Sequence, residues 1–206
     1  RQFLEDSTGL QGEEGGFPAD HPYTGLHATP RGPGMPDLWM LGSGGDGALI
    51  AAQYGMAYCF AHFINQDAGT QPLDVYRKNF RPSRELATPK GAIAVSVTVA
   101  DTEEDAKRIA SSRNLWVMHL LQNRGGPFPS IEEALDYPYS DVGRAMLRAI
   151  EQRGFAGTPE QVRGKLLALG EAHGVDDFTI LTIAYDQKDR VRSYELLAEA
   201  MGIKAG

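Results

Sequence analysis

The sequence predicts an α/β protein with a parallel sheet, because apolar strand patterns alternate along the chain with helical patterns. Four short apolar segments are expected to be strands: Leu38–Leu41, Met56–Ala61, Ala92–Val99 and Asp177–Ala184. Two arrangements fit four such units, a small open doubly wound sheet and half of an eight-stranded βα barrel. A complete barrel needs about 250 residues, and this chain has 206.

The first two units follow an irregular N-terminal segment, residues 1–36, in which glycines and prolines interrupt any periodicity. The apolar run Leu38–Leu41 is typical of a strand buried on both faces. A glycine-rich turn, Gly42–Gly47, leads into a helix of small residues over Ala48–Tyr54. The strand Met56–Ala61 is again apolar throughout, and a short helix, Leu73–Phe80, follows it.

The third strand, Ala92–Val99, is the clearest of the four, because it is rich in Val and Ile. Asp101 or Thr102 caps a helix that runs towards His119. The first turn of this helix carries Glu103, Glu104 and Asp105, which favour the positive end of a helix dipole.

The last part of the chain contains an excursion, Gly125–Tyr139, with three prolines, and then a helix over Asp141–Gln152. Thr158–Gln161 has the pattern of a helix start, with Thr as N-cap, Pro at the first position and Gln at the third. It leads into a helix over Val162–His173, and the final helix is Arg192–Met201. Residues 37–206 therefore form one predicted βα domain, either a small open sheet or a C-terminal half-barrel.

Composition excludes several classes of partner. Twenty Lys and Arg against twenty-seven Asp and Glu give a net charge of −7, which argues against a nucleic-acid binder. No apolar run approaches the roughly 18 residues of a membrane span. The single cysteine, Cys59, is expected to be a small buried hydrophobe in a reducing cytoplasm. No His pair has metal-ligand spacing, so no metal is expected.

The turn after the first strand is the strongest local candidate for a binding site. Glycines let a backbone approach a ligand closely, and free N–H groups at a helix start favour an anion such as phosphate. The spacing Gly42-x-Gly44-x-x-Gly47 formally matches a dinucleotide fingerprint, but any tight strand-to-helix turn also recruits glycine. Asp46 opposes a phosphate if it points inward and is favourable as an N-cap. Both interpretations stay open from the residues alone.

Two further side chains follow strands at the end where βα barrels keep their sites. His62 comes directly after the second strand, and it either lines a pocket or forms structural hydrogen bonds. Tyr185 comes just after the fourth strand, and it either faces a pocket or packs against a loop.

Several short motifs, in order, resemble the bacterial luciferase-like (flavin-dependent) monooxygenase family. They are Leu38–Ser43, Ala51–Gly55, Phe60–Phe63, Arg77–Pro82, Gly157–Val162, Tyr185-Asp186 and Arg190–Glu199. The similarity extends from about Phe17 to Met201. It implies an eight-stranded βα barrel (a TIM barrel) of which this chain is the C-terminal half.

The resemblance also implies a function. Reduced flavin mononucleotide (FMN), supplied by a flavin reductase, would react with O2 and oxidise a small organic substrate. The alternatives are a non-catalytic flavin-binding relative and an isolated piece of a larger polypeptide. An oligomer, or association with a missing N-terminal half, is expected to cover the open sheet, and the chain alone is expected to be inactive.

The resemblance assigns residues to the flavin. The turn residues Ser43, Gly44, Gly45, Asp46 and Gly47 match positions that help to hold its phosphate, and Ala61 and His62 match positions near its ring. The catalytic residues are unknown, with His62 and Tyr185 as the candidates.

Overall fold

The computed structural model describes residues 17, 20–26 and 36–203. Most of the predicted N-terminal segment 1–36 lies outside these residues. The chain divides into two compact units, Arg1–Trp39 and Met40–Gly206, and each is described by itself. In the first unit the rings of Phe17 and His21 stack at 4.3 Å between centroids.

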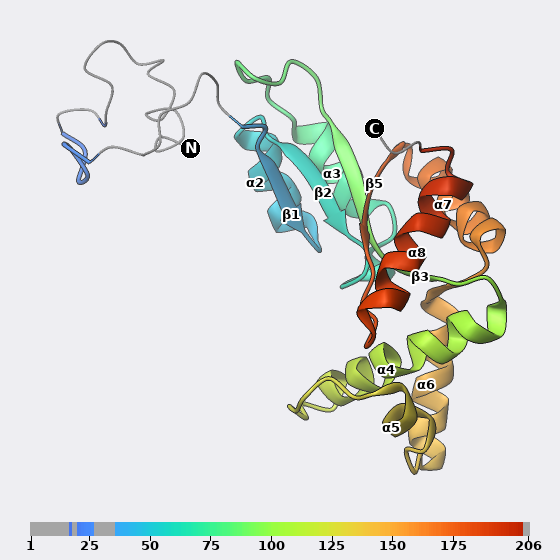
Figure 1. Ribbon diagram of the computed structural model, residues 1–206. Helices are drawn as coiled ribbons and strands as arrows, with labels where there is room; N and C mark the ends of the chain where they lie inside the picture. Colours follow the sequence, from blue (N-terminus) through green and yellow to red (C-terminus); the bar gives the residue numbers. More distant parts are fainter. Residues whose placement is uncertain (1–16, 18–19, 27–35, 204–206) are drawn as a thin grey trace. The chain divides into compact units, whose positions relative to one another are not determined.

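The elements of the described chain alternate as the sequence predicts. In order they are β1 Trp39–Gly42, α2 Gly45–Gln53, β2 Ala57–Ala61, the short 3₁₀ turn η1 Gln66–Ala68, α3 Gln71–Asn79, β3 Gly91–Val99, α4 Glu103–Leu121, α5 Ile131–Leu135, α6 Asp141–Arg153, β4 Phe155–Gly157, α7 Pro159–His173, β5 Asp177–Leu181 and α8 Gln187–Ala200 (Figure 1).

The sheet is organised around β3. The strand order is β1-β2-β3-β4, and β5 also pairs with β3. β2 and β5 both run parallel to β3 and both pair with its residues Ala92–Ala94, so they lie on its two edges. β4 pairs in parallel with Val97–Val99, at the carboxyl end of β3.

The two faces of β3 carry different side chains. Ile93, Val95, Val97 and Val99 are buried in the main core, which β2 and the helices α2, α3, α7 and α8 complete. Because side chains alternate across a strand, Ala92 and Ala94 lie on the opposite face, where they pack with Cys59 and with Phe63. Branched side chains therefore face the helices, and small ones face the open side of the sheet.

Small residues on the open face let the sheet curve. The Sγ of Cys59 on β2 lies 3.7 Å from the Oγ1 of Thr179 on β5, although β3 separates these two strands. Adjacent strands are about 4.8 Å apart, so side chains two strands apart meet only where the sheet bends over small residues. Such bending is what closing a sheet into a barrel requires.

The helices α4, α5 and α6 form a separate layer beyond the carboxyl end of β3, in the lower part of Figure 1. Their contact is apolar and includes Leu115, Met118 and Ala134, with Met146 and Ile150 packed against them. This layer borders the sheet at the end where parallel βα folds place their sites.

Local helix signals are confirmed. The Oγ1 of Thr102 accepts a hydrogen bond from the N–H of Asp105 at 3.1 Å, as expected of an N-cap. Thr158 and Gln161 form a reciprocal capping box ahead of α7. Gly174 ends α7 in the left-handed conformation, at φ 61°.

Three details differ from the sequence-based expectation. β1 is not buried on both faces, because Leu41 is 56% exposed and only one face of the strand meets helices. The strand β4, Phe155–Gly157, and the helix α5, Ile131–Leu135, were not expected. Both are shorter than the window over which a hydrophobic period can be recognised.

Two glycines of α7 allow a matched test of this packing. A Cβ at Gly170 would lie 2.7 Å from the carbonyl oxygen of Val175 and 3.0 Å from the ring of Phe178, whereas a Cβ at Gly164 meets nothing within 4 Å. We expect Gly170→Ala to lower the free energy of unfolding by about 1–3 kcal/mol through overpacking. Gly164→Ala should raise it by up to about 1 kcal/mol through helix propensity.

Urea denaturation of both variants measures the difference. Equal effects of the two substitutions would contradict the close approach of α7 to β5.

Candidate functional site

The glycine-rich turn between β1 and α2 is held by its carbonyl groups. The hydroxyl of Tyr58 donates to the carbonyl oxygens of Gly42 at 2.9 Å and Gly44 at 3.2 Å. The Nδ2 of Asn65 donates to the carbonyl oxygen of Ser43 at 3.0 Å. Burial raises the pKa of Tyr58 to about 12, so its hydroxyl remains a donor at neutral pH. Side chains of Tyr58 and Asn65 therefore occupy the carbonyl oxygens of Gly42, Ser43 and Gly44.

The three glycines of the fingerprint spacing, Gly42, Gly44 and Gly47, lie in different surroundings. A Cβ at Gly42 would lie 3.1 Å from the ring of Tyr58, so this position is tightly packed. A Cβ at Gly47 would lie 3.4 Å from the Cα of Gly42, which is an ordinary contact. A Cβ at Gly44 meets nothing within 4 Å, and this residue has an extended backbone with φ −164°. Packing thus accounts for Gly42 and leaves Gly44 and Gly47 unexplained.

The N-cap of α2 is Gly44, which provides no side-chain cap, and not Asp46. Asp46 is exposed within the first helical turn, where a carboxylate suits the helix dipole. The first N–H groups of an α-helix have no partner inside the helix. No side chain of the described residues caps those of α2.

Ala61 is the last residue of β2, His62 follows it, and their side chains lie on opposite faces of the sheet. By alternation with Cys59, Ala61 lies on the open face. The ring of His62 lies on the helix-covered face, 6.0 Å from Phe60 and 5.9 Å from Phe155 between centroids. His62 is buried, and its Nδ1 has no hydrogen-bond partner in the described part of the chain.

A second histidine lies beside it. The ring centroid of His173 is 6.4 Å from that of His62, and its ring nitrogens contact the carbonyl oxygens of Leu169 at 2.9 Å and Gly69 at 3.2 Å. Burial, and to a smaller extent His173, lower the pKa of His62. This environment favours a neutral, packed imidazole at His62.

Tyr185 stands just beyond β5 and is 51% exposed. Its ring stacks on Phe128 of the excursion at 6.5 Å, and Phe128 in turn contacts Trp116 of α4 at 5.9 Å. Tyr185 therefore joins β5 to the α4–α6 layer through aromatic contacts.

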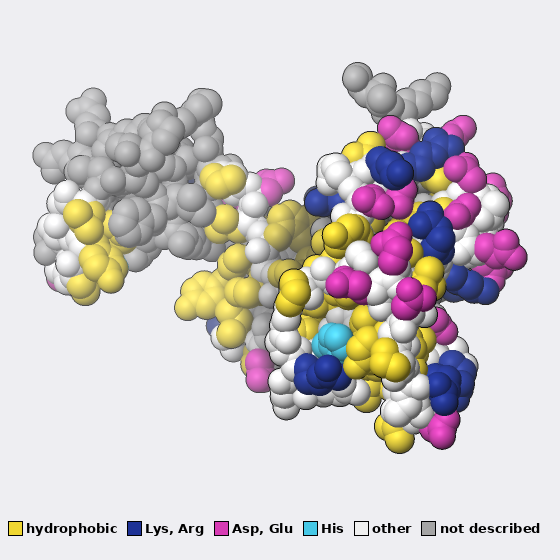
Figure 2. All heavy atoms as spheres, turned by 60° about the horizontal axis from the view of Figure 1, so that its bottom comes forward, with side chains coloured by type: hydrophobic (Ala, Val, Ile, Leu, Met, Phe, Trp, Pro, Cys, Tyr) yellow, Lys and Arg dark blue, Asp and Glu magenta, His cyan; other side chains and the backbone are white. Residues whose placement is uncertain are grey.

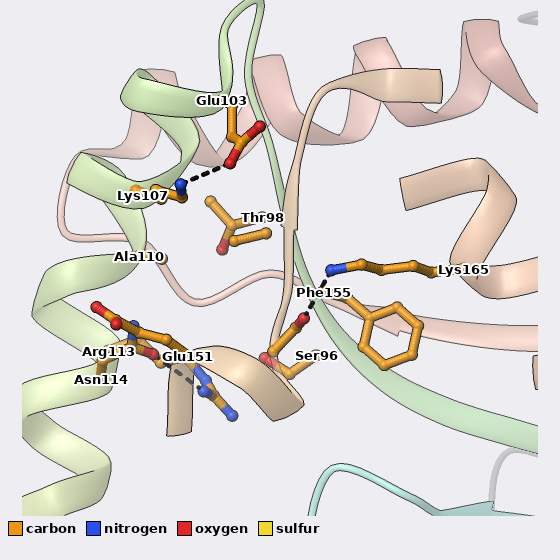
Figure 3. Close-up of a pocket in the computed structure, with 12 residues that line it drawn as sticks. Ser96, Thr98, Glu103, Lys107, Ala110, Arg113, Asn114, Glu151, Phe155 and Lys165 are labelled. Carbon is orange, nitrogen blue, oxygen red and sulfur yellow. Dashed lines mark hydrogen bonds and ion pairs between the residues drawn. The ribbon is translucent and has the colours of Figure 1, made fainter. Parts of the chain in front are cut away.

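Sequence reasoning missed a cavity of about 160 Å³ between β3, α4, α6 and α7. Figure 3 shows Ser96 and Thr98 of β3, Arg113 and Asn114 of α4, and Glu151 of α6 around one space. A neighbouring cavity of about 170 Å³ shares Ser96 and Arg113 with the first. An arginine inside the apolar pattern of α4 was the only signal in the sequence.

The described residues show two further features that concern partners. They contain no group of three His, Cys, Asp or Glu side chains that could hold a metal ion, and no helix among them is both long and apolar enough to span a bilayer. Acidic and basic side chains are interspersed on the face seen in Figure 2.

The environment of His62 sets a pH dependence. A histidine whose pKa is lower in the folded than in the unfolded chain stabilises the fold fully above the unfolded value of 6.5, and this stability is lost as the pH falls through the lowered folded value. We expect the free energy of unfolding to decrease between about pH 7.5 and about pH 5.5. His62→Phe, which keeps the aromatic packing, should show a smaller decrease.

Denaturation at the two pH values measures this difference. An equal decrease in the parent chain and the variant would show that His62 is not the group responsible.

Comparison with known proteins identifies the family. The family model of luciferase-like monooxygenases matches residues 7–177. The chain is 35% identical over 197 residues to YceB of Bacillus subtilis (strain 168), covering 96% of this chain and 57% of YceB. It is 29% identical over 210 residues to the N-acetyl-S-alkylcysteine monooxygenase of the same organism, covering 98% of this chain and 60% of that protein.

The structure of apo-MsnO8 superposes with a TM-score of 0.77 at 30% identity, over 92% of this chain and 57% of that one. The chain thus spans somewhat more than half the length of these relatives, and its parallel βα units correspond to about half of their barrel. The sequence motifs, the curved parallel sheet and these matches agree, and the chain belongs to the luciferase-like monooxygenase family.

Proposed function

We propose that the chain forms the phosphate-binding turn and part of the ring pocket of an FMN-dependent monooxygenase. Members of the family are flavin-dependent monooxygenases. The observation that supports this assignment most directly is the turn from Ser43 to Gly47. Tyr58 and Asn65 engage its carbonyl oxygens, while a Cβ at Gly44 would meet only open space.

The donors of the turn suit a phosphate. The first N–H groups of α2 have no acceptor within their helix, and the hydroxyl of Ser43 forms no hydrogen bond within the described residues. Backbone N–H groups bind phosphate oxygens without a basic side chain, because several of them point the same way at a helix start. Asp46 reduces the attraction, and its exposure to water limits that effect.

The ring would lie over the open face beside Ala61. Ala61, Cys59, Ala92 and Ala94 are small, so their side chains take up little space on this face, and they are buried, so they contact little water. The side chain of His62 faces the helices, which supports its structural role and leaves its backbone as the part near the ring. When bound, reduced FMN supplies the activation of O2.

Partners follow from this proposal. A flavin reductase would supply reduced FMN in the cytoplasm. Among the described residues, β1, β4 and β5 each pair with one strand only, and an uncovered edge of a parallel sheet is unstable. The remainder of a barrel, or a second chain, would cover these edges and complete the shielded pocket.

The named relative suggests a substrate class. Since it oxidises N-acetyl-S-alkylcysteines by name, we propose a small organic thioether for this chain as well. No acid–base pair is needed on the protein, because O2 would supply the oxygen atom and the role of the protein is to position the substrate and exclude water.

Gly44→Val tests the flavin site. Its Cβ meets no atom of the described residues and its backbone is extended, so a side chain fits. Because Gly44 is the N-cap of α2, where Val is less favourable than Gly, we expect stability to fall by about 1 kcal/mol or less. A side chain at this point would crowd the phosphate, so FMN affinity should fall about tenfold or more. Riboflavin, which lacks the phosphate, should bind parent and variant equally. Fluorescence quenching of each flavin provides the measurement, and an unchanged affinity for FMN would remove the turn from the site.

Turnover tests the requirement for the other strands. We expect the 206-residue chain, given reduced FMN, O2 and a panel of thioethers, to yield no sulfoxide above the uncatalysed background. The reason is that four βα units would provide only about half of the contacts to the flavin and half of the wall that keeps water out of the pocket. Sulfoxide formed by the chain alone would contradict this expectation.

A further inference from the structure

The cavity between β3, α4, α6 and α7 contains hydrogen-bond donors without acceptors. Within the described residues, the buried Nε of Arg113 has no hydrogen-bond partner and the side chain forms no ion pair. Its one hydrogen bond runs from Nη1 to the Oδ1 of Asn114 at 3.3 Å. Burial lowers the pKa of the guanidinium, which nevertheless stays charged at neutral pH.

Three more donors line the same cavity. The hydroxyls of Ser96 and Thr98 and the Nδ2 of Asn114 form no hydrogen bonds within the described part of the chain. Thr98 and Asn114 are buried. Buried polar groups without partners are costly to a fold. Among these four donors, the Nε of Arg113 is the atom that is fully buried without a partner in the described residues, and Ser96 is only half-buried. One buried unpaired donor with three further donors around the same space indicates a ligand that accepts hydrogen bonds.

The other charges of the cavity do not satisfy Arg113. Glu103 accepts from the Nζ of Lys107 at 2.5 Å and from the Nε2 of Gln161 at 2.9 Å. Lys165 donates to the carbonyl oxygen of Gly154 at 3.3 Å. Glu151 is exposed, and it lies beyond ion-pair distance of Arg113. Among the described residues, Arg113 and Lys165 are therefore the cations of this cavity that form no ion pair, and Arg113 is the one with a buried, unpartnered donor (Figure 3).

The neighbouring cavity supplies an apolar wall. Ser96 and Arg113 line both cavities, and Phe63, Val117 and Leu121 line the second one. This second cavity also includes Asn65, which donates to the carbonyl oxygen of Ser43 in the turn assigned above to FMN. A ligand with its charged end at Arg113 would thus extend an apolar group towards the flavin side.

We propose that Arg113, with Ser96, Thr98 and Asn114, binds the carboxylate of a small organic acid substrate and directs its apolar end towards the flavin. The proposal deepens the proposed function and rests on it for the identity of the ligand as substrate. The same donors would also suit the phosphate of FMN, so the experiment separates the two sources of the oxyanion.

Calorimetric titration of the 206-residue chain uses two probes, N-acetyl-S-benzyl-L-cysteine and its uncharged carboxamide. We expect the acid to bind about tenfold or more tightly than the amide, since hydrogen bonds to a charged group carry the difference. In Arg113→Met, the affinity for the acid should fall to the affinity for the amide. The matched control is Arg163→Met, an exposed arginine of α7, which should leave both affinities unchanged.

Thermal unfolding separates binding from a structural role. Because a half-buried cation that forms no ion pair within the described residues opposes folding, Arg113→Met should raise the melting temperature of the unliganded chain while it removes acid binding. A lower melting temperature would show that Arg113 is structural. Thr98→Val, which keeps the shape of the side chain, should weaken acid binding several-fold and provides a second variant.

Three results would overturn the proposal. They are equal binding of acid and amide by the parent chain, unchanged acid affinity in Arg113→Met, and a preference for FMN over riboflavin that Arg113→Met abolishes. The last result would assign the cavity to the flavin phosphate. Gly44→Val should leave acid binding intact, so a failure of the flavin assignment is distinguishable from a failure of this one.

Discussion

The alternation of side-chain size along β3 is the constraint on which the rest of the structure depends. Ile93, Val95, Val97 and Val99 fill the core under the helices. Ala92 and Ala94 place only methyl groups on the other face of the strand. Because the alanines are small, Cys59 and Thr179 meet above them and the sheet bends. The bend, in turn, brings the carboxyl ends of neighbouring strands around a common space. A larger residue at either alanine would push the flanking strands apart and flatten this arrangement.

The same strand explains how the site acquires its polar groups. On the face of β3 that carries Ala92 and Ala94, the next two side chains towards the carboxyl end are Ser96 and Thr98. The hydroxyls thus appear where α4 leaves the sheet, and Arg113 reaches them from that helix. α8 secures this end from the other side, since the N–H of Val99 donates to the buried Oγ of Ser193 at 2.9 Å.

Much of the fold could be predicted, because its main strands and helices carry local signals. The four strands, the Thr102 and Thr158 caps and the glycine end of α7 depend on residues within one or two turns of one another. β4 and α5 could not be predicted, since three to five residues contain no complete hydrophobic period. The cavity depends on residues of β3, α4, α6 and α7 that are far apart in sequence. Packing also decided which way Ala61 and His62 face, and sequence position alone did not.

The pairing of β3 with β5 has a consequence for the order in which the chain becomes structured. Ala92 of β3 pairs with Asp177 of β5, so one edge of β3 stays unpaired until the long segment between the two strands has been synthesised. During synthesis on the ribosome, the β2–β3 pair and its helices emerge first, with the other edge of β3 open. Contacts of such long sequence separation form slowly. The nascent chain therefore exposes the most apolar strand of the molecule for the time it takes to translate α4 through α7, which is when chaperone binding would matter most.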